Sequence, residues 1–234
     1  MKILAVDCAD KAASCAVVED GARICESFVS AGLPHSRTLM PMVESMLKNS
    51  ELTLKDIDLF AVTVGPGSFT GLRIGIAAVK GMAMGCGKEC VGVSTLHAIA
   101  MEAKDMAGLI CAVMDARCNQ VYNALFYSDG TTLTRICEDR ALMCDELEKE
   151  LLEYKQKNLD KKIILVGGGM DLCYNKFGER LDCAKVSNNI SVQRAGEVAI
   201  LAGEYAPVGP QDLLPSYLRL PQAERELKAK TESK

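Results

Sequence analysis

One pattern of strands occurs twice in the chain, and it restricts the possible folds more than any other feature. Each copy has an apolar run that ends in an aspartate, a second apolar run, a turn rich in aspartate and glycine, and a third extended run. In the first copy these parts lie at residues 2–7, 12–18, 19–21 and 22–29. In the second copy they lie at residues 109–115, 121–127, 128–130 and 131–137. Because such runs joined by Asp-Gly turns are typical of hairpins, the sequence predicts two copies of a three-stranded antiparallel unit.

Each hairpin unit is followed by a helical stretch and by a strand that runs into glycines, at residues 62–67 and again at residues 163–169. This order predicts an α/β protein of two lobes, each with a mixed five-stranded sheet and flanking helices. It resembles the duplicated actin-like ATPase (ASKHA) fold of sugar kinases, Hsp70 and actin, in which two lobes face each other across a nucleotide cleft. The alternative is two mixed sheets without that relationship.

Composition and charge narrow the class further. With 49% hydrophobic and 25% charged residues, the chain is expected to be globular and not disordered, fibrous or membrane-embedded. Its net charge of −4 provides no overall field that would gather nucleic acid. The start lacks the apolar stretch of a signal peptide and the eleven cysteines lie mostly in apolar runs, so we expect reduced thiols and a cytoplasmic protein. With two histidines and no Cys-x-x-Cys pair, no metal site is expected.

Two helices of the first half are more apolar than a surface helix needs to be. The first is expected to begin near Thr38, with Pro41 in its first turn; the alternative is a start at Ser36, with a bend where Pro41 lacks an amide. The second is expected to span residues 70–85, which is too short for a membrane span. Burial against a sheet needs an apolar stripe of only about 100°. We therefore expect the excess to form a subunit interface; the alternative is helices buried between their own sheet and each other. The expected interface residues are Leu39, Met40, Met42, Val43, Met46, Leu47, Arg73, Ile76, Val79, Met82 and Ala83.

A glycine-rich loop, here called the motif loop, leads into the second of these helices. It consists of Gly65, Pro66, Gly67, Ser68, Phe69, Thr70 and Gly71. Amides at a helix N-terminus are suited to an anion, but the loop lacks the Gly-Lys-Ser or Gly-Lys-Thr ending of a Walker motif. Ser68 or Thr70 would equally well cap the helix. The pattern by itself is weak support for phosphate binding.

Several motifs, taken in order, resemble the TsaB (YeaZ) family of bacterial proteins for the synthesis of threonylcarbamoyladenosine in tRNA. They lie at residues 3–7, 35–41, 65–75, 114–117, 121–122 and 215–219. The resemblance runs from residue 1 to about residue 220. It implies a first lobe of residues 1–104 joined by the segment 207–221, a second lobe of residues 105–206, and an exposed tail of residues 222–234.

The resemblance also implies a function. It indicates a non-catalytic scaffold, without a cofactor, that binds the transferase TsaD as a heterodimer and TsaE through that complex, or that pairs with itself through the same surface. Two basic groups, at residues 155–162 and 225–230, are expected to be solvated surface. Transfer RNA is therefore expected to contact the complex and not this chain alone.

The chain departs from catalytic relatives at the positions that carry chemistry. TsaD holds a metal with two histidines, and the resemblance places Thr95 and Ile99 there, with His97 expected to be a packed helix residue. The loops after the two strand-end aspartates, Asp7 and Asp115, lack the glycine that lets backbone approach a phosphate in kinases of this fold. The remaining candidate for weak nucleotide binding is the loop of Gly167, Gly168 and Gly169. The alternative function, a small-molecule kinase or a glycoprotease-like enzyme, is not favoured.

Overall fold

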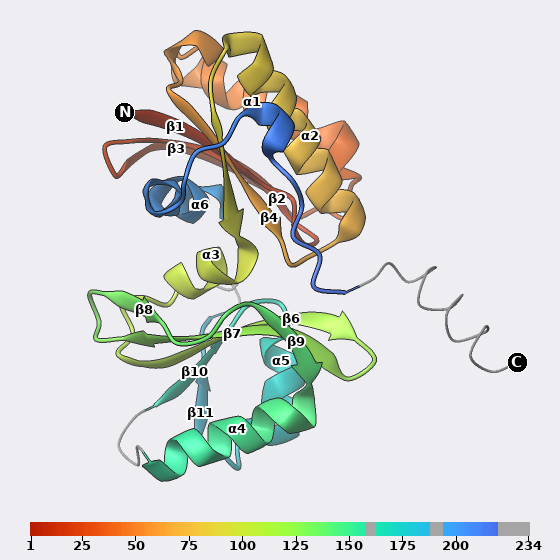
Figure 1. Ribbon diagram of the computed structural model, residues 1–234, viewed down its shortest axis with the longest axis vertical. Coiled ribbons are helices and arrows are strands. Elements are labelled where there is room, and N and C mark those ends of the chain that lie inside the picture. Colours follow the sequence, from red (N-terminus) through yellow and green to blue (C-terminus); the bar gives the residue numbers. More distant parts are fainter. Residues whose placement is uncertain (158–161, 188–193, 220–234) are drawn as a thin grey trace, which may run out of the picture.

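The computed structural model describes residues 1–157, 162–187 and 194–219, which form two lobes, each built around its own sheet (Figure 1). In the first lobe, the hairpin unit forms three antiparallel strands and two parallel strands extend it, in the order β3-β2-β1-β4-β5. The bounds are β1 Lys2–Asp7, β2 Ala13–Glu19, β3 Ala22–Val29, β4 Leu59–Gly65 and β5 Cys90–Ser94. This lobe therefore has the predicted mixed five-stranded sheet.

The second lobe repeats the hairpin unit with one change. Its strands are β6 Gly108–Arg117, β7 Gln120–Ser128, β8 Leu133–Arg135, β9 Arg140–Met143, β10 Ile163–Val166 and β11 Cys183–Lys185. The order is β11-β10-β6-β7-β8, and β9 also pairs with β7. The prediction of five strands is wrong here, because the third run expected at residues 131–137 is interrupted. Residues 136–139 belong to no strand, and two short strands pair with β7 in place of one.

Helices cover both faces of the first sheet (Figure 1). On one face lie α1 His35–Asn49 and α2 Phe69–Cys86. On the other face lies α6 Ala195–Leu201, whose Ala195, Val198 and Leu201 pack among residues of β1 and β2. The predicted boundary of the second lobe at residue 206 is therefore wrong for α6, which belongs to the first lobe. It lies there because its apolar side buries a sheet face that α1 and α2 leave open.

The helix α3 Thr95–Met101 forms the joint between the lobes (Figure 1). Its Leu96 and Ile99 lie in the core of the second lobe, whereas Ala98 and Met101 lie in the core of the first. The far side of the second sheet is covered by α4 Cys144–Lys157 and α5 Met170–Cys173, which continues into a π-helical turn at Tyr174–Gly178. All seven residues of α3 are buried, as a helix between two sheets must be.

Hydrogen bonds to Pro34 and Ser68 set the first turns of the two apolar helices, α1 and α2. Of the two predicted starts of α1, the one near Thr38 is wrong and the one at Ser36 is correct to within a residue. The Pro34 carbonyl already accepts hydrogen bonds from the amides of Arg37 and Thr38, and Pro41 lies inside the helix on its exposed side. For α2, the predicted span is confirmed to within a residue at each end. The predicted cap is also confirmed, since the Ser68 hydroxyl accepts a hydrogen bond from the Gly71 amide at 3.3 Å.

The described C-terminal residues return along the first lobe. Val208 forms a bridge with Cys90, and Pro210–Asp212 is a 3-10 turn beside α2. The Lys80 ammonium donates to the carbonyl oxygens of Gln211 and Leu213, both at 3.2 Å. The predicted tail of residues 222–234, with its basic residues, lies outside the described residues. In the described part of the chain, no helix is long and apolar enough to cross a membrane.

Candidate functional site

The motif loop lies at the mouth of the crevice between the lobes and packs against the turn that follows β1. A Cβ atom on Gly67 would lie 2.5 Å from the Ala9 carbonyl oxygen, and one on Gly71 would overlap the carbonyl of Cys8. The Ser68 amide donates to the Ala9 carbonyl at 2.7 Å. Two of the motif glycines are therefore required by close backbone packing inside the chain, and one amide of the loop already has an internal acceptor.

A cavity of about 250 Å³ lies between this loop and the second lobe. Its charged lining consists of Asp10 from the first lobe, Asp115 and Arg117 from the second, and Arg219 from the C-terminal segment. Ser68, Phe69 and Tyr122 complete its polar and aromatic wall. Since two carboxylates face two guanidinium groups, the cavity has no single sign of charge that would select an anion.

The two strand-end aspartates serve the local backbone. Asp7 is 1% exposed, and its Oδ1 accepts a hydrogen bond from the Ala9 amide at 2.7 Å. Burial raises the pKa of Asp7 to about 6. Asp115 is exposed and accepts a hydrogen bond from the Arg117 amide at 2.7 Å, at the start of a turn in which three consecutive residues have positive φ. Both are placed as turn residues, as the missing glycines led us to expect.

The three glycines of the candidate nucleotide-binding loop pack against other parts of the chain. Gly167 has φ of +101°, and a Cβ there would overlap the carbonyl of Val113. A Cβ on Gly168 would lie 2.7 Å from a carboxylate oxygen of Asp10 in the other lobe, and one on Gly169 would lie 2.9 Å from the backbone of Met114. These contacts explain by packing alone why glycine is needed at all three positions. Nucleotide binding therefore stays a prediction.

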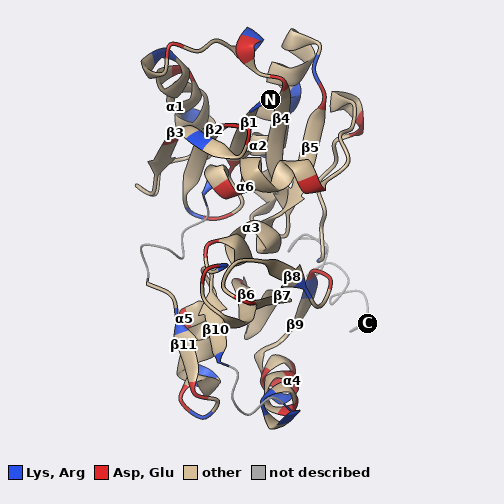
Figure 2. Ribbon diagram, turned by 90° about the vertical axis from the view of Figure 1, so that its left-hand side faces the viewer, with Lys and Arg blue, Asp and Glu red and all other residues tan. Residues whose placement is uncertain are grey.

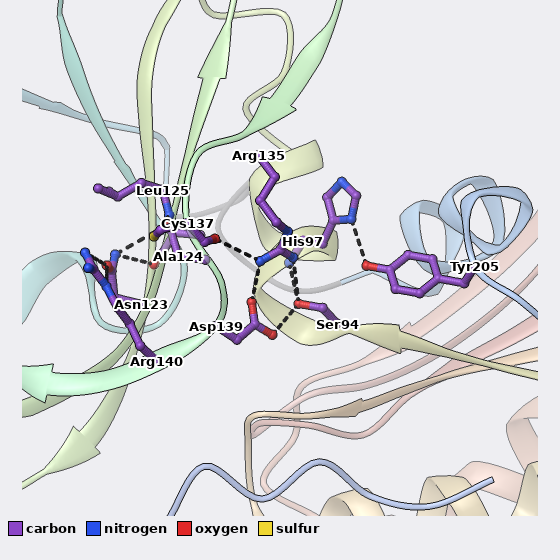
Figure 3. Close-up of polar contacts among 11 residues, drawn as sticks. Ser94, His97, Asn123, Ala124, Leu125, Arg135, Cys137, Asp139, Arg140 and Tyr205 are labelled. Atoms are coloured by element: carbon purple, nitrogen blue, oxygen red, sulfur yellow. Dashed lines mark hydrogen bonds and ion pairs between the residues drawn. The ribbon is translucent and has the colours of Figure 1, made fainter. Parts of the chain in front are cut away.

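A polar network that the sequence did not predict joins the lobes beside α3 (Figure 3). The Arg135 guanidinium donates to Asp139 Oδ1 at 2.8 Å and to the Ser94 hydroxyl at 3.2 Å. It also lies over the ring of Phe126, with its central carbon 4.6 Å from the ring centroid. The interruption between β8 and β9 brings Asp139 to Ser94. No motif marks these residues, since they come together only when the lobes pack.

The second histidine of the chain is a packed helix residue, which confirms the prediction. His97 is 9% exposed, its ring stacks on Phe126 with centroids 5.2 Å apart, and its Nδ1 lies 2.8 Å from the Tyr205 hydroxyl. Burial lowers its pKa to about 4, so the imidazole is neutral near pH 7. Thr95 and Ile99, which the resemblance led us to expect at the metal-ligand positions, are buried. Among the described residues, no group of three or more His, Cys, Asp or Glu side chains is arranged to hold a metal ion.

Most of the expected interface residues pack inside the first lobe. Nine of the eleven expected residues are 7% exposed or less and belong to one core cluster with β1, β2 and β4: Leu39, Met42, Val43, Met46, Leu47, Ile76, Val79, Met82 and Ala83. Met40, at 44% exposure, and Arg73 are the exposed members of the predicted set. The apolar excess is thus explained in large part by packing between the helices and the sheet, and a partner would reach the buried residues only where they line a groove.

One such groove does lie between α1, α2 and the 3-10 turn Leu54–Asp56, and it is here called the α1–α2 groove. It has a volume of about 640 Å³. Its lining is mainly apolar, with one acidic and one basic side chain: Met40, Pro41, Val43, Glu44, Leu47, Lys48, Leu52, Leu54 and Met82. Elsewhere, the positions of Lys and Arg and those of Asp and Glu are interspersed along the ribbons of both lobes (Figure 2).

Comparisons with known proteins agree with this architecture. The family model described as TsaD: tRNA N6-adenosine threonylcarbamoyltransferase matches residues 30–208. The chain is 36% identical over 171 residues to the tRNA threonylcarbamoyladenosine biosynthesis protein TsaB of Escherichia coli, covering 72% of each chain. It is 29% identical over 227 residues to the TsaB protein of Bacillus subtilis, covering 96% of each.

A solved structure, YeaZ from Pseudomonas aeruginosa, has the same fold. The TM-score is 0.73 at 24% identity, with 93% of this chain and 99% of that chain covered. The expected duplicated actin-like fold is confirmed by this likeness and by the two mixed sheets. On the strength of these matches in sequence and structure, the chain belongs to the TsaB (YeaZ) family, within the larger family that the TsaD model describes.

Proposed function

We propose that this protein is a non-catalytic subunit in the synthesis of threonylcarbamoyladenosine in tRNA. Family membership supports the pathway, since the relatives from E. coli and B. subtilis carry that pathway in their names. The α1–α2 groove supports the role of a binding subunit. It is a large, mainly apolar hollow on the surface of a chain whose crevice holds no cluster of metal-ligating side chains among the described residues.

The partner that fits this proposal is a TsaD-type transferase, bound as a heterodimer through α1 and α2. Apolar contacts along the groove would supply most of the binding free energy, and Glu44 and Lys48 at its rim would orient the partner. TsaE would join through that complex, and tRNA would be bound by the assembly. The same groove would let two copies of this chain pair when TsaD is absent.

The arrangement around Asp7 and Asp115 favours the non-catalytic role over a kinase. A kinase of this fold would need these carboxylates to face a metal and a phosphate in the crevice. Asp7 is instead buried, with its Oδ1 bonded to the Ala9 amide, and the Oδ1 of Asp115 is bonded to the Arg117 amide. Neither loop has the glycine that would let a phosphate approach the backbone closely.

Met40→Glu tests the binding surface. Met40 is 44% exposed and lines the groove, so a carboxylate there should leave the fold intact and weaken association with TsaD at least about tenfold. Met106→Glu is the matched control, because Met106 is 38% exposed and does not line the groove. Met46 and Met82 are poor test positions, since both are 5% exposed and an acid there would disrupt the core. Equal affinities for the two variants by light scattering and titration calorimetry would reject this surface.

Modification of tRNA in vitro tests the role itself. Purified pathway proteins should form threonylcarbamoyladenosine only when this chain is included, and the chain alone should show no turnover. Modification at the same rate without it would reject the proposal. ATP turnover by the isolated chain that is lost in Asp115→Asn would instead establish the kinase.

A further inference from the structure

The motif loop has a binding partner inside its own chain. We propose that residues 213–219, here called the strap, are the ligand of the motif loop, and that the strap ties the two lobes together at a fixed angle. This inference concerns the geometry of the single chain, so it stands or falls independently of the partners proposed above.

The backbone of the strap continues the end of β4. The Ser216 amide donates to the Val64 carbonyl at 2.8 Å. Gly65 has φ of +136°, and a Cβ atom there would overlap the carbonyl oxygen of Ser216. The first motif glycine is therefore needed both for its own conformation and for the approach of the strap. Upstream, the strap is anchored by Leu213, which is 3% exposed in the core of the first lobe.

Side chains of Phe69 in the motif loop and of Arg73 in α2 contact the next residue of the strap, Tyr217. The Tyr217 ring stacks on Phe69, with ring centroids 4.5 Å apart and planes inclined by 23°. The Arg73 Nε donates to the Tyr217 hydroxyl at 2.8 Å, and the Arg73 guanidinium lies 5.7 Å from the centre of the same ring. Gly65, Phe69 and Arg73 thus act on two consecutive strap residues, Ser216 and Tyr217. A peptide segment, and not a phosphate, is the group that these contacts recognise.

The strap then crosses to the second lobe. The Arg219 guanidinium donates to the Ala116 carbonyl near the end of β6. Arg219 lines the cavity beside Arg117, whereas Ser216 and Leu218 line the separate cavity beside Ser94 and Arg135. The strap therefore runs between these two cavities. Three extended residues span at most about 10 Å, so separation of the lobes would break the contact at Tyr217 or the one at Arg219.

Hydrogen exchange and small-angle X-ray scattering on full-length variants test the strap. Tyr217→Ala should speed exchange in the peptide that contains the Ser216 amide about tenfold, because the stacking and one hydrogen bond are lost. Tyr217→Phe keeps the stacking and should give an intermediate rate. Arg219→Ala should increase the radius of gyration while the circular dichroism spectrum stays unchanged, since the lobes lose a tie but keep their own cores.

Arg117→Ala is the matched control for Arg219→Ala. Arg117 lines the same cavity and carries the same charge, and its amide donates to Asp115 Oδ1. It should leave both the exchange rates and the radius of gyration at their wild-type values. Unchanged exchange in Tyr217→Ala would overturn the assignment of the strap as ligand of the motif loop. Equal expansion in Arg117→Ala and Arg219→Ala, or no expansion in either, would overturn the interlobe tie.

Discussion

The hydroxyl of Ser94 donates a 2.6 Å hydrogen bond to the carboxylate of Asp139, and this bond joins the two lobes. Ser94 ends β5 in the first lobe and also accepts the His97 amide as the cap of α3. Asp139 lies in the interruption between β8 and β9, where it also pairs with Arg135. The break in the second hairpin unit is therefore part of the contact between the lobes.

The pairing of Arg135 with Asp139 should contribute measurably to stability. Both side chains are largely buried, at 23% and 17% exposure, so Asp139→Ala leaves a guanidinium partly buried without its carboxylate. We expect a loss of about 2 kcal/mol in the free energy of unfolding, measured by urea denaturation. Glu19→Ala, which breaks the more exposed pair between Lys2 and Glu19, at 29% and 42% exposure, should have a much smaller effect. Equal losses in the two variants would contradict the role assigned to Asp139.

Asp7 should make stability depend on pH in a defined window. Burial raises its pKa from 3.8 to about 6, so the folded protein holds this proton more tightly than the unfolded chain does. Asp7 therefore costs stability progressively as the pH rises from about 4 to about 6, and the cost persists above that range. Asp7→Asn removes this titration and retains an acceptor for the Ala9 amide. The free energy of unfolding of Asp7→Asn minus that of wild type should increase through that window, and the increase should reach roughly 3 kcal/mol at pH 7. A flat difference between pH 4 and pH 7 would refute the shift.

Two glycines of α2 should respond in opposite directions to the same substitution. A Cβ on Gly71 would overlap the Cys8 carbonyl, whereas a Cβ on Gly81 meets nothing within 4 Å. Gly71→Ala should cost about 2 kcal/mol, because helix and turn must move apart. Gly81→Ala should raise stability by about 0.5–1 kcal/mol, since alanine reduces the freedom of the unfolded chain. Thermal unfolding of the pair gives the comparison, and a stabilising Gly71→Ala would exclude the packing described for the motif loop.

Thiol accessibility separates the eleven cysteines, all of which are free in the structure. Cys118 is exposed, Cys25, Cys86 and Cys137 are half-buried, and the other seven are buried. Ellman's reagent should therefore react in a fast phase with one thiol, and Cys118→Ser should abolish that phase. In denaturant without reductant, all eleven should react. A smaller final count would reveal a disulfide.

The features that could be predicted from the sequence are those that depend on local patterns of residues. The two hairpin units follow from alternating apolar runs and Asp-Gly turns, and the start of α2 follows from a serine cap. The sequence did not predict that α6 would pack on the first sheet, because its apolar residues fit a helix on either lobe. The interruption at residues 136–139 was also missed, since it depends on Ser94 from the other lobe.

The interface prediction shows a related limit. Periodicity identifies an apolar helix face, but it does not say whether a sheet, another helix or a partner protein covers that face. In this structure, most of the apolar surface of α1 and α2 is buried between the two helices and against the sheet. The motif loop was recognised as a unit, yet its contact with residues some 150 positions later in the chain leaves no local signal.

The placement of α6 also determines the order in which the protein can fold during synthesis. The face of the first sheet that carries Ala5, Ala16 and Val18 is covered by Ala195 and Val198 of α6 together with Ala98 and Met101 of α3, and Leu213 completes the other face. On the ribosome, the first half of the chain therefore emerges with one apolar sheet face covered only in part, and α6 completes the cover when nearly the whole chain has been made. The N-terminal half thus depends on the last part of the chain, and a prematurely terminated product should be prone to aggregate.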